Sequence, residues 1–292
     1  MDSKILNRRQ SKDFGQTVNL HTEMKVSDER YQSIFHNWKE PSKCAQSKRG
    51  NDCWVCSKLK TEGIVKDSSV KLLIIGDLHG RIPELLELLK ADTYKAIVCV
   101  GDLGIYADLV NAMLDKKAFV KDSYLLLNDL EKLPIPLYSI KGNHDDYSLL
   151  KSQELADKNI FYLEQGQVLQ IDNLTIGGIG GIYSSVKSYF DVNTLKGMER
   201  RFFTEGEIQD LIDKNIKLDV LLTHEAAASK CVKPGEGNIL FDKLVNSVDH
   251  KLYLYGHHHV NKKIDDKTIA LGAISTGGSY VVINTLTREL MS

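Results

Sequence analysis

Short apolar runs recur along the chain, and each is followed at once by a cluster of polar residues. Five such clusters occur, at residues 77–80, 101–102, 142–145, 223–224 and 256–259. Runs of this length predict buried strands of an α/β protein, with the polar residues where each strand ends. Ligand sites of α/β sheets form at the carboxyl ends of strands, so we expect the clusters to meet at one edge.

The clusters contain carboxylates, one amide and imidazoles, a ligand set that suits two hard or borderline divalent metals held side by side. Two cations about 4 Å apart repel each other, so we expect an anionic ligand between them, and one carboxylate can bridge both. Imidazole and amide ligands add no further charge. The candidate ligands are Asp77, His79, Asp102, Asn143, His224, His257 and His259. His257 and His259 should project in one direction from an extended segment.

The pattern after residue 66 predicts alternating strands and helices, followed by late hairpins. Strands are predicted at 71–76, 95–100, 218–223 and 251–255, with another that ends at Ile140 and shorter ones at 262–264, 268–271 and 279–284. Helices are predicted from Ile82, over 107–114, over 125–133 and over 204–214, the last with Thr204 and Glu207 at capping-box positions. Residues 168–177 predict a hairpin. This order indicates a two-sheet sandwich flanked by helices.

Composition is that of an ordinary globular enzyme, with 42% hydrophobic and 26% charged residues and a net charge of −1. No apolar run reaches 18 residues, and the first residues lack the apolar region of a signal peptide, so we expect no membrane partner. The chain has five cysteines. An odd number without a secretion signal predicts reduced thiols and a cytoplasmic location.

Residues 1–66 differ from the rest and are predicted to form a small N-terminal extension to a domain over 67–292. A tetrahedral zinc site is one interpretation of four residues there, His36, Cys44, Cys53 and Cys56. A redox pair, incidental cysteines and a disordered tail are the alternatives. A nucleic-acid-binding module is a further alternative, since basic residues surround the cysteines and Trp54; they are Arg8, Arg9, Lys43, Lys48, Arg49, Lys58 and Lys60.

The order GDxHG, GD, GNHD, TH, GHxH resembles the calcineurin-like metallophosphoesterase superfamily, from about Lys71 to the C-terminus. The resemblance implies an α/β fold, a four-layer β-sandwich flanked by helices. It also implies two sets of metal ligands, with Asp77, His79 and His259 on one ion, Asn143, His224 and His257 on the other, and Asp102 as the bridge. His144 matches the family's histidine that contacts the scissile phosphate, and Asp145 a supporting carboxylate. His258, between two ligands, is interpreted as exposed.

One departure bears on the substrate. Protein Ser/Thr phosphatases of this superfamily continue the second cluster as GDxxDRG, whereas residues 101–106 here read Gly-Asp-Leu-Gly-Ile-Tyr. We therefore expect neither the carboxylate that partners His144 nor the phosphate-binding Arg, and a protein phosphatase is disfavoured. Residues 159–163 and 176–183 are similar to stretches of the RNA lariat debranching enzymes, which often have cysteine where this chain has Asp77. The glycines of the second stretch are interpreted either as a close-packed loop or as a substrate-specific feature.

These observations predict a phosphoester hydrolase that depends on two divalent metals, Mn, Fe or Zn, with one additional structural Zn if the extension binds it. A phosphodiester of a nucleotide or nucleic acid is the favoured substrate. A phosphomonoesterase or pyrophosphatase acting on a small phosphoester is the alternative. An alternative of another class is a non-catalytic nucleic-acid-binding scaffold, which would be expected to have lost metal ligands. The sequence predicts no protein partner.

Overall fold

The computed structural model describes residues 70–121, 123–276 and 280–291. The candidate zinc ligands His36, Cys44, Cys53 and Cys56 lie outside the described residues, as does the predicted domain division near residue 66. Both therefore stay predictions. Among the described residues, no helix combines the length and the apolar character needed to cross a membrane.

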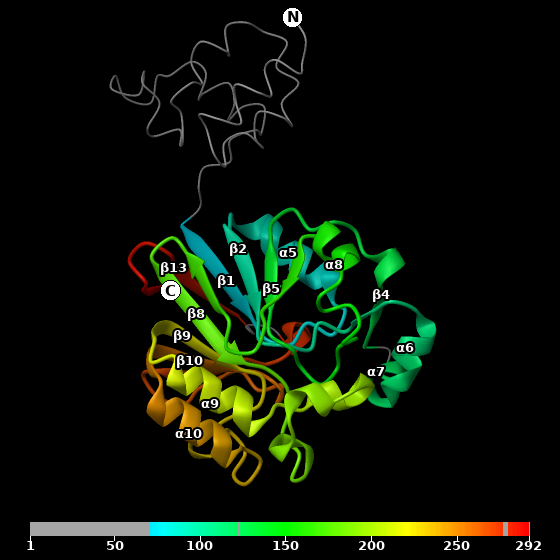
Figure 1. Cartoon of the computed structure of the whole chain (residues 1–292). Coiled ribbons are helices and arrows are strands. Elements are labelled where there is room, and N and C mark those ends of the chain that lie inside the picture. The colour runs from blue at the N-terminus through cyan, green and yellow to red at the C-terminus, as the bar shows by residue number, and fades with distance from the viewer. Residues whose placement is uncertain (1–69, 122, 277–279, 292) are drawn as a thin grey trace, which may run out of the picture. The chain divides into compact units, whose positions relative to one another are not determined.

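The first sheet has the strand order β14-β13-β1-β2-β5-β6. Its strands are β1 (Lys71–Ile75), β2 (Ala96–Cys99), β5 (Leu137–Ser139), β6 (Ile160–Tyr162), β13 (Tyr280–Asn284) and β14 (Leu290–Met291). β1, β2, β5 and β6 run parallel, whereas β13 runs antiparallel to β1. The carboxyl ends of the four parallel strands therefore share one edge, as Figure 1 shows for β1, β2 and β5.

The second sheet has the order β11-β12-β10-β9-β8-β7. Its strands are β7 (Val168–Ile171), β8 (Leu174–Ile179), β9 (Lys217–Thr223), β10 (Asp249–Tyr255), β11 (Lys262–Lys263) and β12 (Thr268–Ala270). β8, β9, β10 and β12 are parallel, and β7 and β8 form the predicted antiparallel hairpin. β9 and β10 therefore also end at a common edge.

Three hydrophobic clusters separate four layers, which confirms the predicted architecture. One cluster packs the first sheet against α5 (Ile82–Ala91) and α8 (Gln153–Asp157). The second lies between the two sheets. The third packs the second sheet against α9 (Glu205–Asp213) and α10 (Ile239–Ser247), which cover its outer face in Figure 1.

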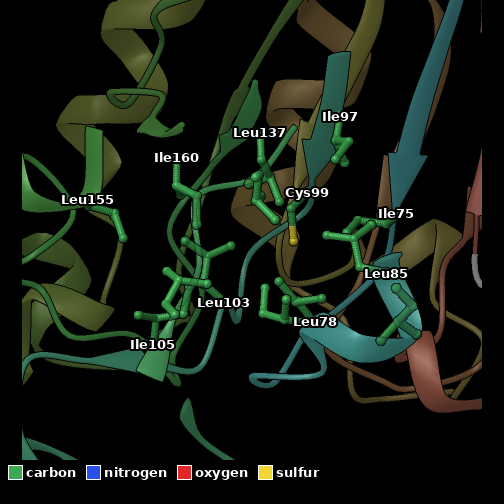
Figure 2. Packing of buried hydrophobic residues seen from close by; sticks show 14 of the residues in the cluster. Ile75, Leu78, Leu85, Ile97, Cys99, Leu103, Ile105, Leu137, Leu155 and Ile160 are labelled. Carbon is green, nitrogen blue, oxygen red and sulfur yellow. The ribbon is translucent and has the colours of Figure 1, made fainter. Parts of the chain in front are cut away.

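Successive side chains of β1 point to opposite faces of the first sheet, and both faces are buried. Leu73 and Ile75 belong to the cluster under α5, whereas Leu72 and Ile74 belong to the cluster between the sheets. Figure 2 shows Ile75 beside Leu85 of α5. A fully buried side chain of this size contributes about 1.5–3 kcal/mol, so a strand that is apolar on both faces is stable only when both faces are covered.

Most predicted elements are present within a few residues, including the capping box of Thr204 and Glu207 that begins α9. The helix predicted over 125–133 was wrong. Residues Leu125–Leu126 form β4, which pairs with β3 (Ile105–Tyr106), and Leu127–Asp129 form a short 3-10 helix. The apolar spacing that predicted a helix there comes from Leu130 and Leu133, which are buried in the first cluster although their backbone is not helical.

Two short helices between β3 and β4 matter for the site. α6 (Leu109–Leu114) and α7 (Lys116–Val120) are capped by the side chains of Asp108 and Asp115. The other 3-10 helices of the described residues are Lys187–Tyr189, Val192–Thr194, Gly197–Arg201, Ala228–Lys230 and Ile274–Thr276.

Candidate dinuclear metal centre

The polar clusters meet where the parallel strands of both sheets end. β1 leads to Asp77, β2 to Asp102 and β5 to Asn143, while β9 and β10 of the other sheet lead to His224 and His257. Asp77, Asp102, Asn143 and His224 are buried, with Asp77 and His224 fully so. These residues therefore come together at the strand ends, where the sequence predicted that the clusters would meet.

The side chains form two groups that share one carboxylate. In each group, every residue offers a ligand atom within 4.8 Å of the others. The first group is Asp77, His79, Asp102 and His259, and the second is Asp102, His224 and His257. Asn143 belongs beside the second group, because its Oδ1 lies 3.1 Å from Nε2 of His224. The family resemblance predicts the same division of these residues between two metal ions.

Asp102 lies between the two groups, and only one of its carboxylate oxygens accepts hydrogen bonds from the described residues. Its Oδ1 accepts backbone hydrogen bonds from Asn143 and His144, both at 2.7 Å. Nε2 of His224 lies 3.3 Å from the same oxygen, and Nε2 of His79 lies 3.7 Å from Oδ2. Oδ2 is buried and has no hydrogen-bond partner among the described residues. A buried carboxylate oxygen in this position calls for a cation.

His79 gives a second indication of a cation. Its Nδ1 is buried without a hydrogen-bond partner in the described part of the chain, and its Nε2 lies 2.9 Å from Nε2 of His259. Two ring nitrogens that face each other need either a proton or a metal ion between them. Together with two carboxylates and an amide oxygen, these donors suit a centre of two divalent metals.

Backbone conformation is unusual at four of these residues. His79, Asp102, His257 and His259 all have a positive φ, between 47° and 67°. The left-handed region is uncommon for residues other than glycine, and such strain gathers at functional sites. The expected extended segment at His257–His259 was therefore wrong. Its two outer histidines reach different metal groups through left-handed turns rather than along one face of a strand.

Gly142 lets Asp102 approach the backbone closely. A Cβ at this position would lie 2.0 Å from Oδ1 of Asp102. That oxygen could then no longer accept the backbone hydrogen bonds of Asn143 and His144. The glycine that begins the GNHD cluster is therefore required by the placement of the shared carboxylate.

The imidazoles differ in protonation because their surroundings differ. Burial lowers the pKa of His257 to about 3, and the nearby His224 acts in the same direction. Burial would also lower the pKa of His224, but Asp102 and then Asp77 outweigh it and raise that pKa to about 10. Nδ1 of His224 lies 2.9 Å from the Val100 carbonyl, and donation there leaves Nε2 directed at Asp102 and Asn143. A metal that binds Nε2 would displace its proton.

His144 has a carboxylate partner, contrary to the expectation from the missing GDxxDRG residues. Nδ1 of His144 lies 2.6 Å from Oδ2 of Asp115. The same oxygen accepts a hydrogen bond of 2.9 Å from the hydroxyl of Tyr106, which stands where the phosphatases have Arg. Oδ1 of Asp115 accepts from the Ala118 amide and so caps α7. The sequence motifs did not single out Asp115. An Asp at a helix N-cap is a local signal that could mark it, but this signal says nothing about His144.

The contact between His144 and Asp115 shifts the pKa of both residues. Burial opposes the charged form of each, but the hydrogen bond between them prevails. The pKa of His144 is raised and that of Asp115 is lowered. The ring of His144 also lies 5.5 Å from that of His79, centroid to centroid. A histidine that favours its protonated form is thereby held beside the metal groups.

Asp145 supports the same loop from behind. Its Oδ2 accepts from the Gly142 amide at 2.6 Å, and its Oδ1 from the Leu103 amide at 2.7 Å. It thus joins the second and third clusters, which are otherwise separate in sequence.

His258 is buried, so its interpretation as an exposed histidine was wrong. Only 8% of its surface is exposed. Its Nε2 lies 3.3 Å from Sγ of Cys231 and its Nδ1 lies 3.4 Å from Glu236. These contacts anchor the loop that carries His257 and His259 to the segment before α10.

The glycine run begins inside β8 and is close-packed where it leaves the strand, as one of its two predicted interpretations has it. A Cβ on Gly180 would lie 2.3 Å from the carbonyl oxygen of Lys141, and the Gly181 amide donates to that carbonyl at 2.7 Å. The run therefore packs directly against the chain that enters the GNHD cluster.

Comparison with known proteins places this site in a family. The sequence profile of the calcineurin-like phosphoesterase family matches residues 70–261. A lariat debranching enzyme of Entamoeba histolytica is 25% identical over 242 residues, which cover 70% of this chain and 68% of that enzyme.

Solved structures give a further comparison. One crystal structure shares the fold, with a TM-score of 0.51 at 12% identity, covering 76% of this chain and 97% of its own. The crystal structure of TT1561 of Thermus thermophilus gives a TM-score of 0.48 at 14% identity, over 76% of this chain and 96% of its own. The family profile covers well over half of the chain, and the donor set suits two divalent metals. The chain belongs to the calcineurin-like phosphoesterase family and is a metal-dependent phosphoester hydrolase.

Proposed function

We propose that the enzyme is a phosphodiesterase that acts on a nucleotide or nucleic acid. The observation that carries the proposal is the pair of ligand groups sharing Asp102, with the His144–Asp115 pair beside them. This arrangement provides charge neutralisation and a proton donor at one place, and hydrolysis of a diester with a poor leaving group needs both.

The ligands divide between two ions as the geometry suggests. Asp77, His79 and His259 would hold one ion, and Asn143, His224 and His257 would hold the other. The carboxylate of Asp102, which belongs to both groups, would serve both ions. Divalent ions at these positions would supply Lewis-acid chemistry, which neutralises phosphate charge and makes water a better nucleophile.

His144 acts as the general acid. Asp115 accepts from Nδ1, so Nε2 is the ring nitrogen left to meet a substrate oxygen. Asp115 also favours the imidazolium form, which carries the proton that a departing alkoxide needs. Tyr106 and the cap of α7 fix Asp115 in turn, so the orientation of His144 depends on residues outside the motifs.

Two observations favour a diester over a monoester. A monoester carries an additional negative charge, for which the protein phosphatases use the Arg of GDxxDRG. Tyr106 occupies that position here and is buried, with its hydroxyl engaged by Asp115. In addition, the relative from Entamoeba histolytica is a lariat debranching enzyme, and debranching acts on nucleic acid.

The test compares diester and monoester hydrolysis by the purified full-length enzyme supplied with Mn²⁺ or Zn²⁺. We expect kcat/KM for bis-p-nitrophenyl phosphate to exceed that for p-nitrophenyl phosphate, and expect cleavage of 2′,5′- or 3′,5′-linked dinucleotides. Hydrolysis of mononucleotides faster than of every diester would instead support the phosphomonoesterase alternative.

Asp102→Ala serves as the control for metal dependence. The variant should lose activity on all substrates and lose at least one metal ion by elemental analysis, because no other described group is placed to link the two ligand groups. Normal activity with both ions retained would contradict the proposed role of Asp102.

A further inference from the structure

A polar pocket lies beside the candidate metal centre, at the same edge of the first sheet. Its volume is about 460 Å³, and its lining includes Lys141, Tyr147, Tyr162 and Arg200. Lys141 follows β5 and Tyr162 ends β6, so the pocket continues the row of strand ends that carries the metal ligands.

The pocket shares its wall with the GNHD cluster. Lys141 and Tyr147 bracket residues 142–145, and the hydroxyl of Tyr147 donates to the carbonyl of Gly142 at 2.9 Å. The backbone from Lys141 to Asn143 spans at most about 7 Å. The wall of the pocket at Lys141 therefore lies close to Asn143, a candidate metal ligand.

Positive charge exceeds negative charge by one among the residues that line the pocket. Lys141 is only 5% exposed, and its Nζ donates to the Phe202 carbonyl at 2.9 Å. Glu207 faces it at 3.9 Å but also accepts two hydrogen bonds from Thr204. Arg200 adds a second cation. Lys151, at the margin, is already paired with Glu164 at 2.9 Å.

The two cations retain hydrogen-bonding capacity. An ammonium has three N–H donors and a guanidinium five. Nη1 of Arg200 donates to the Tyr147 carbonyl at 3.0 Å, which fixes the exposed side chain at the pocket. An anion between Lys141 and Arg200 would relieve the repulsion between the two cations.

We infer, resting on the phosphodiesterase function proposed above, that this pocket binds a second phosphate group of the substrate, one that flanks the phosphodiester being cleaved. The excess of one positive charge matches the single charge of a phosphodiester, and Arg suits phosphate because its planar donors form paired hydrogen bonds. The substrate is accordingly an oligonucleotide with at least two phosphates rather than a mononucleotide or a single cyclic nucleotide.

The experiment measures kcat/KM for a dinucleotide that contains one phosphodiester and for the same dinucleotide with an additional terminal phosphate at either end. For the wild-type enzyme, one terminal phosphate should raise kcat/KM by about 10- to 100-fold, mainly through KM. This is the range for one charge-assisted hydrogen-bonded contact. Arg200→Gln should remove most of that gain.

Lys196→Gln is the matched control, because it removes one positive charge from the same exposed segment but does not line the pocket. It should preserve the gain from the terminal phosphate. An equal loss of the gain in Lys196→Gln would mean that diffuse charge, and not the pocket, attracts the substrate, and it would overturn the inference.

Further outcomes keep the two proposals distinguishable. If wild-type enzyme cleaves the one-phosphate dinucleotide but gains nothing from a second phosphate, the pocket assignment fails and the phosphodiesterase function stands. If no diester is cleaved, including bis-p-nitrophenyl phosphate, the proposed function fails. If inorganic phosphate, added separately, stimulates the one-phosphate substrate as much as the attached group does, the pocket takes a free anion, and the substrate assignment is wrong.

Discussion

The substitution Asp115→Asn removes the negative charge of Asp115 and keeps the size of its side chain. Asp115 caps α7 through Oδ1, while Oδ2 accepts from both His144 and Tyr106. Asn caps helices about as well as Asp, but its amide has one acceptor oxygen and no charge. The variant therefore cannot satisfy all three donors, and it removes the negative charge opposite Nδ1 of His144.

The expected magnitude follows from the geometry of this pair. At 2.6 Å the Coulomb attraction would be about 6 kcal/mol for an effective dielectric constant of about 20. The net worth of a hydrogen bond to a charged group is smaller, about 1.5–3 kcal/mol. Because the side chains of His144 and Asp115 are only 16% and 7% exposed, solvent screens the pair weakly. At about 1.4 kcal/mol per tenfold, we expect kcat to fall about 10- to 100-fold.

The assay compares two leaving groups on otherwise normal enzyme. A dinucleotide, whose leaving group is a ribose hydroxyl, should show the full loss because that oxygen needs a proton. Bis-p-nitrophenyl phosphate should show a smaller loss, since p-nitrophenolate leaves readily without one. Metal content should stay at the wild-type value, because Asp115 contacts His144 and none of the candidate metal ligands.

Asp108→Asn is the matched control, since Asp108 caps the neighbouring helix α6 at 2.9 Å without contact to His144. It should leave both rates near those of wild type. An equal loss on the two leaving groups in Asp115→Asn would show that the acid function of His144 does not depend on Asp115. An equal loss in Asp108→Asn would assign the effect to the stability of these short helices.

Three further predictions concern other parts of the chain. Burial would raise the pKa of Asp219, but hydrogen bonds from Lys251 and Thr175 outweigh burial and hold that pKa below its usual value. The carboxylate therefore stabilises the fold above about pH 4, and this stabilisation is lost as the pH falls through the folded-state pKa. Urea unfolding of Asp219→Asn should show a loss of about 1.5–3 kcal/mol at pH 7 that shrinks in acid; a loss independent of pH would contradict this assignment. Gly142→Ala should lower activity by about 100-fold, because its Cβ would displace Asp102, whereas Gly206→Ala in α9 meets no atom nearer than 3.9 Å and should not; similar rates for the two would refute the role of Gly142. If the extension binds zinc, Cys53→Ser combined with Cys56→Ser should release one zinc ion and spare the phosphoesterase metals, and an unchanged metal content would exclude that site.

The sequence alone identified the strands that precede the five clusters and the candidate ligands that follow them. Apolar runs such as 71–75 and 217–223 are local signals, and the polar residue after each is placed by the strand end itself. The capping box at Thr204 and the hairpin at 168–177 are local in the same sense. The order of the five clusters along the chain was enough to indicate the family.

Only the tertiary structure decided how His144 is held. Asp115 and His144 are 29 residues apart and meet because two short helices fold back over the third cluster. Burial of His258 against Cys231 and the left-handed backbone of His257 and His259 arise in the same way. Periodicity reports whether a residue faces a core, but a contact between two loops depends on the packing of everything between them. That is why the ligand types could be predicted from sequence, whereas the partner of His144 and the pocket around Lys141 could not.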